Sequence, residues 1–148
     1  MKTTTIKQGC MLPGTPHQVY ELLMDEKQHA SFTGGEASIS QKVGGAFSTF
    51  DGWASGKNVE LVPDQKIVQT WRADDPRQER GPAKGGGWPP GHYSTLTIKL
   101  LKAPKGTKLL FTQTDVPSQH AKSIARGWKD YYWNPLRELL GGSQGPKK

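Results

Sequence analysis

The segment from Ser118 to Leu140 limits most strongly how this chain can fold, because it predicts one long helix with a wide apolar face. Plotted at about 100° per residue, its apolar residues form a stripe that is about 140° wide. The stripe contains Ala121, Ile124, Ala125, Trp128, Tyr131, Tyr132, Leu136 and Leu139. Ser118 is expected to cap this helix, and Gly141 and Gly142 are expected to end it. Pro135 predicts a bend, since it cannot donate a backbone hydrogen bond, and Trp133 is predicted to face outward.

Through the middle of the chain, apolar residues alternate with a period of two, which predicts β-strands. Six strands are expected, at Glu36–Ser40, Ala46–Asp51, Trp53–Val62, Lys66–Arg72, His92–Leu101 and Thr107–Asp115. Most of their connections are too short for a crossover helix, so the sheet is expected to be antiparallel.

A further strand is expected at the start of the chain, over Thr3–Met11, and two short helices are expected after it. Thr15 and Gln18 have the spacing of a capping box at the start of the first helix. Asp25 can cap the second helix, and Gly34 can end it.

This order of elements predicts a single α+β domain over residues 1–142. A curved antiparallel sheet of about seven strands would wrap around the long C-terminal helix, which is the helix-grip fold. Residues 74–87 are rich in proline, glycine and charge and predict a flexible insertion, and residues 143–148 predict a disordered tail.

Composition argues against several classes of function. The net charge is +7, but charges are spread along the chain and lysines such as Lys99, Lys102, Lys105 and Lys108 are interpreted as solvated surface, so no nucleic-acid partner is expected. No apolar run approaches the about 18 residues of a membrane span. The lone Cys10 indicates a reducing compartment, and we predict a cytoplasmic protein. The scattered histidines predict neither a metal site nor a cofactor.

The predicted interior between sheet and helix carries polar as well as apolar side chains, and alternation also places Val59 inward. The candidate ligand cavity is lined by Gln69, Trp71, Ser94, Leu96, Phe111, Gln113, Trp128 and Tyr131. An apolar cavity with a few polar groups is typical of a small-molecule site. The alternative is a filled core in which these polar groups bond to Tyr131, Tyr132 or the backbone.

Five motifs carry a family resemblance when they are taken in order along the chain. They are Gly44–Phe47, Phe50–Gly52, Ile67–Arg72, Trp88–His92 and Gly127–Tyr132. Together they resemble the C-terminal domain of the activator of the 90-kDa heat-shock protein ATPase. That domain belongs to the START-like (SRPBCC) superfamily, which includes the birch pollen allergen and polyketide cyclases, and the resemblance implies a helix-grip fold.

The resemblance also frames the expected function, which is binding rather than catalysis. A stand-alone domain that binds an apolar or aromatic small molecule is the first hypothesis. A module that contacts the 90-kDa heat-shock protein through its basic surface is the alternative. The N-terminal domain that carries the family's main activating motifs is not in this sequence, so we expect weak stimulation of the ATPase or none. A cyclase-like enzyme is the third hypothesis, and only His92 and Glu36 are candidates for its acid or base.

Overall fold

The structure is a computed structural model that describes residues 2–50, 52, 54–73, 88 and 91–142. The insertion predicted at residues 74–87 and the tail predicted at 143–148 lie outside the described residues. The remainder has the predicted α+β architecture, in which a long C-terminal helix packs on one face of an antiparallel sheet.

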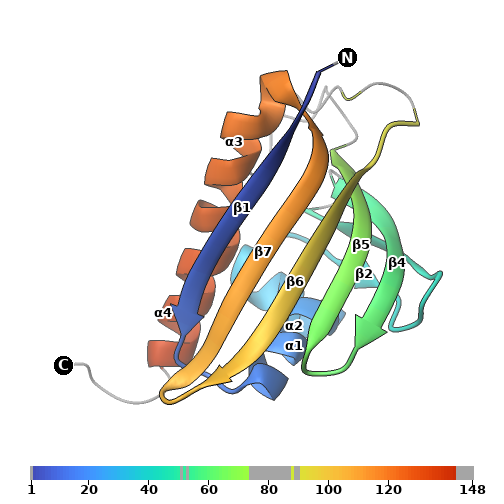
Figure 1. The fold of residues 1–148 in the computed structure, drawn as a ribbon. Helices are drawn as coiled ribbons and strands as arrows, with labels where there is room; N and C mark the ends of the chain where they lie inside the picture. The colour runs from blue at the N-terminus through green and yellow to red at the C-terminus, as the bar shows by residue number, and fades with distance from the viewer. Residues whose placement is uncertain (1, 51, 53, 74–87, 89–90, 143–148) are drawn as a thin grey trace.

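The sheet has seven strands in the order β1-β7-β6-β5-β4-β3-β2, and every neighbouring pair is antiparallel. The strands are β1 (Thr3–Leu12), β2 (Ser38–Ile39), β3 (Ala46–Thr49), β4 (Ala54–Val62), β5 (Lys66–Ala73), β6 (Ser94–Ala103) and β7 (Gly106–Pro117). The helical segments are α1 (Pro16–Met24), α2 (Glu26–Thr33), α3 (Ser118–Trp128), η1 (Lys129–Trp133) and α4 (Asn134–Gly142). Figure 1 shows all the helices behind the sheet, so the face toward the viewer is left open. This arrangement is the helix-grip fold.

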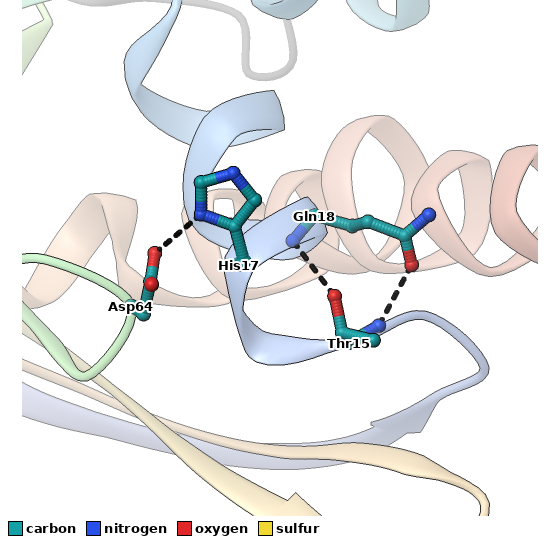
Figure 2. A network of polar contacts seen from close by, with 4 residues as sticks. All are labelled: Thr15, His17, Gln18 and Asp64. Atoms are coloured by element: carbon teal, nitrogen blue, oxygen red, sulfur yellow. Dashed lines mark hydrogen bonds and ion pairs between the residues drawn. The ribbon is translucent and has the colours of Figure 1, made fainter.

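The two short helices begin as the sequence predicts. Thr15 Oγ1 accepts a hydrogen bond from the Gln18 backbone N–H at 3.1 Å, and Gln18 Oε1 accepts one from the Thr15 N–H at 2.8 Å (Figure 2). Asp25 caps α2 by accepting from two backbone N–H groups of its first turn. Gly34 ends α2 with φ 82°, a conformation that favours glycine. Local capping chemistry therefore fixes both helices.

The long C-terminal helix contains a π-helical turn, η1, which changes the buried face from the one predicted. The Asn134 N–H donates to the Lys129 carbonyl five residues earlier, directly before Pro135. An extra residue in one turn rotates every later side chain by roughly 100° relative to a regular helix. Trp133 is therefore buried at 3% exposure, whereas Tyr131 is 38% exposed, so both predictions were wrong.

The same rotation changes which of two leucines near the end of the helix is buried. Leu140 is buried, while Leu139, which the regular stripe placed inward, is exposed. Leu136 stays fully buried. Pro135 follows the π turn and lies in the first turn of α4.

Ser118 does not cap α3, which corrects another prediction. Its hydroxyl bonds to that of Thr4 at 2.7 Å, and its N–H donates to the Lys2 carbonyl at 2.9 Å. Pro117 occupies the cap position without a side-chain bond. The serine instead joins the start of the helix to the start of β1.

Val59 was predicted to face inward and is exposed. A β-bulge between Asn58 and Glu60 interrupts the pairing of β4 with β5, which reverses the alternation at this point. Asn58 faces inward instead, and its Nδ2 donates to the carbonyls of Ser40 and Lys42.

Candidate functional site

Trp128 occupies the centre of the interior between sheet and helix. Its ring lies 5.8 Å from that of Trp71, 4.7 Å from Phe111, 4.6 Å from Tyr132 and 5.6 Å from Trp133, measured between ring centroids. Rings at these separations are in packing contact. The place at which the sequence predicts a cavity is therefore largely filled by aromatic side chains.

A chain of buried hydrogen bonds connects Trp128 to the sheet. Trp128 Nε1 donates to Gln113 Oε1 at 2.9 Å, and Gln113 Nε2 donates to Ser94 Oγ at 2.9 Å. Ser94 Oγ donates in turn to the Trp71 carbonyl at 2.8 Å. Gln113 and Ser94 thus face inward as predicted, but their hydrogen bonds are made within the fold.

Gln69, the third predicted polar residue, has a different partner. Its Nε2 donates to Asn58 Oδ1 at 2.9 Å and lies 3.9 Å from Met24 Sδ. Through the bonds of Asn58 this amide supports the segment between β2 and β3.

A small cavity of about 30 Å³ remains beside these residues. It is lined by Leu23, Met24, His29, Ile39, Phe47, Thr49, Ile67, Gln69, Trp71, Ile98, Trp128 and Tyr132. Gln69, Trp71 and Trp128 come from the predicted set. Leu96 and Phe111 are buried in the core but do not line the cavity, and the half-exposed Tyr131 lies outside it with its ring against Phe50.

The polar end of the cavity is formed by a pair that the sequence analysis missed. His29 Nδ1 lies 3.1 Å from the Leu23 carbonyl, and its Nε2 lies 2.8 Å from the Tyr132 hydroxyl. Because a carbonyl only accepts, Nδ1 carries the proton and Nε2 accepts from Tyr132. No periodic pattern marks His29, since α2 is short and polar and Tyr132 is 103 residues away.

Burial changes the titration of both groups. Desolvation lowers the pKa of His29 to about 4, and the hydrogen bond to the Leu23 carbonyl only partly opposes this. Burial also raises the pKa of Tyr132 well above its usual value, and the nearby Thr49 side chain opposes the rise. Near neutral pH both side chains are therefore uncharged.

The two residues considered for acid–base chemistry lie elsewhere. His92 Nε2 bonds to the Asp115 carbonyl at 2.7 Å, Glu36 is exposed, and neither lines the cavity. Over the described ranges, no group of three or more histidine, cysteine, aspartate or glutamate side chains could hold a metal ion. No helix in the described part of the chain is long and apolar enough to cross a membrane.

The sequence of this chain is similar to those of several known proteins. The family described as Activator of Hsp90 ATPase homolog 1-like protein matches residues 13–141. Activator of 90 kDa heat shock protein ATPase homolog 1 of Homo sapiens is 26% identical over 127 residues, which are 86% of this chain and 34% of that protein. A homolog from Dictyostelium discoideum is 29% identical over 128 residues, covering 86% and 30%. The chain thus spans about a third of the length of these curated relatives.

Solved structures share the fold. A Plasmodium falciparum protein described as an HSP90 activator has a TM-score of 0.76 at 23% identity, covering 94% of this chain and 96% of that one. A Chromobacterium violaceum protein has a TM-score of 0.71 at 26% identity, covering 92% and 96%. Since the family matches nearly the whole chain, as the five motifs predicted, this protein belongs to the Activator of Hsp90 ATPase homolog 1-like family.

Proposed function

We propose that this chain is a non-catalytic protein-binding domain and that its partner is a 90-kDa heat-shock protein. The curated relatives are named as activators of that chaperone's ATPase, although the chain spans only about a third of their length. The proposal therefore concerns binding, and not the full activity of those longer proteins. An exposed apolar and basic patch on the open face of the sheet is the observation that carries it.

This outer patch consists of Met11, Lys99, Leu101, Lys108 and Leu110. Strand register places Leu110 beside Lys99, and Lys108 between Met11 and Leu101, so the five residues form two adjacent rows across β1, β7 and β6. Met11 is 49% exposed, Leu101 46% and Leu110 36%. The helices lie on the other side of the sheet (Figure 1), so the patch is open to a partner.

The chemistry of the outer patch favours a partner surface with apolar side chains among carboxylates. Lys99 and Lys108 are exposed, and Lys66, which pairs with Lys99 in the register, adds a third ammonium group nearby. Lys66 forms an ion pair with Glu60 at 3.2 Å, so the net positive charge of the patch comes from Lys99 and Lys108. Complementary charge speeds association and fixes orientation, while buried apolar contacts supply affinity.

The test compares binding of a purified 90-kDa heat-shock protein to the wild-type chain and to Lys99→Glu/Lys108→Glu by calorimetry. We expect the wild type to bind and the charge reversal to raise Kd about tenfold or more, equivalent to at least about 1.4 kcal/mol. Leu101→Ser/Leu110→Ser should weaken binding similarly. Raising the salt concentration should weaken the wild-type complex, because exposed charges are screened over roughly 8 Å at physiological ionic strength.

Lys27→Glu/Lys122→Glu is the matched control, because it changes the net charge equally on the exposed surfaces of α2 and α3. If the control weakens binding as much as the outer-patch variant, net charge rather than the patch controls the interaction. A wild-type chain that does not bind the chaperone would contradict the proposed function.

Binding of an apolar small molecule among Gln69, Trp71 and Trp128 is the second candidate. The largely apolar lining with a few polar groups favours it. The volume of the cavity argues against this function. An engineered cavity that takes up benzene has about 150 Å³, whereas this cavity has about 30 Å³. A cyclase-like reaction has less support, because the titratable side chains that line this cavity, His29 and Tyr132, are bonded to each other.

A further inference from the structure

The Thr49 hydroxyl sits in the cavity wall at the end of β3. The residue is only 3% exposed, and its Oγ1 makes no hydrogen bond to any residue that the structure describes. Buried hydroxyl groups are nearly always paired with protein or with ordered water, because an unpaired one loses its hydration without compensation. This atom therefore needs a partner that the cavity can admit.

Tyr132 lies close to Thr49 but does not satisfy it. The only hydroxyl proton of Tyr132 is donated to His29 Nε2, since His29 Nδ1 must donate to the Leu23 carbonyl. The Tyr132 oxygen still has lone pairs, and the Thr49 side chain lies near enough to oppose the rise in the pKa of Tyr132 as a hydrogen-bond donor would. Thr49 Oγ1 nevertheless does not meet the geometry of a hydrogen bond with any described residue. One buried donor and one buried acceptor thus remain side by side at the polar end of the cavity.

The size of the cavity selects the molecule that can join them. A water needs about 10–15 Å³ of such space and two to four polar partners. The cavity has about 30 Å³, and the Gln69 amide provides a further polar group on its wall. A ring compound would not be accommodated without displacing packed side chains, whereas one or two waters would.

We propose that the cavity is a binding site for an ordered water that accepts a hydrogen bond from Thr49 and donates one to the Tyr132 oxygen. The site is separate from the outer patch, and the inference does not depend on the proposed partner. It assigns the polar end of the interior to a structural water that links β3 to η1.

Nuclear magnetic resonance on the wild-type chain tests the site directly, through magnetisation transfer between water and the Thr49 methyl protons in a deuterated background. We expect magnetisation transfer between water and these methyl protons, with the sign that indicates a water bound for a long time. A high-resolution crystal structure should show density for a water within hydrogen-bond distance of Thr49 Oγ1. A dry cavity by both measurements would overturn the proposal.

Stability of a Thr49→Val variant gives an independent answer, because valine keeps the shape and removes the hydroxyl. If the water is bound, the variant loses one of its partners and the unfolding equilibrium constant should rise about fivefold or more. Thr49→Ser keeps the hydroxyl and should retain the water signal. If the hydroxyl is instead unpaired, Thr49→Val should leave stability unchanged or raise it, which contradicts the water site. If Thr49 bonds directly to Tyr132, stability should fall although the wild type shows no bound water, which contradicts the site as well. Should Thr49→Val fail to fold, the wild-type measurements still decide.

Discussion

At the scale of single residues, His29 is the group that most directly couples this fold to pH. It is packed between the rings of Phe32 and Tyr132, at centroid distances of 5.3 and 5.2 Å. Burial lowers its pKa to about 4, against about 6.5 in an unfolded chain. The folded state therefore resists a proton that the unfolded state accepts.

The free energy of unfolding should fall as the pH drops. Above about pH 6.5 both states have a neutral His29, so its full contribution is present there. Between about pH 7 and pH 5 the unfolded chain gains a proton that the folded chain excludes, which should cost about 2 kcal/mol of stability. Urea denaturation followed by tryptophan fluorescence at several pH values would measure this slope.

His29→Gln is the variant that identifies the responsible group, and it should flatten the slope in this window. His17 has the opposite sign, because its hydrogen bond to Asp64 (Figure 2) raises its pKa and stabilises the fold at low pH. His17→Gln should therefore leave the loss of stability at low pH in place. A slope that survives in His29→Gln would mean that another group controls it.

At the scale of elements, the π turn η1 decides which aromatic residues of the C-terminal helix belong to the core. Trp133→Ala should lower the free energy of unfolding by about 3–5 kcal/mol, because it removes a large buried ring. Tyr131→Ala should cost only about 1 kcal/mol, since this ring loses one edge contact with Phe50. Chemical denaturation of the two variants would measure the difference. Equal costs, or the reverse order, would indicate a regular helix.

Features that depend on near neighbours in the sequence were predictable, whereas the positions at which an extra residue shifts the regular repeat of a helix or strand were not. The capping box of Thr15 and Gln18 and the inward alternation of Ser94 and Gln113 depend on neighbours within a few residues. The π turn and the bulge beside Val59 each add one residue to a regular repeat, and tertiary packing selects them. For the same reason, alternation predicted which polar groups face inward but not that they bond to one another.

At the scale of the whole molecule, the interior is a packed core, and the open face of the sheet carries exposed apolar side chains. Trp128→Ala should cost about 3–5 kcal/mol, because its ring contacts four other aromatic rings. The variant should also contain a cavity of the size of an indole ring. Added indole should bind there and raise the melting temperature of the variant by mass action. The wild type should show no such shift in thermal denaturation. A wild-type shift of similar size would favour the small-molecule site instead.

The pairing of β1 with β7 has a consequence for how the chain reaches this structure. Thr3 lies opposite Pro117, so β1 pairs with β7, which is synthesised more than a hundred residues later. Domains that depend on such distant pairings fold slowly, because the entropy cost of closing a large loop comes before the stabilising contacts form. During synthesis β1 cannot make its pairing with β7 until β7 leaves the ribosome, so its apolar residues Ile6 and Leu12 lack their native cover in that interval.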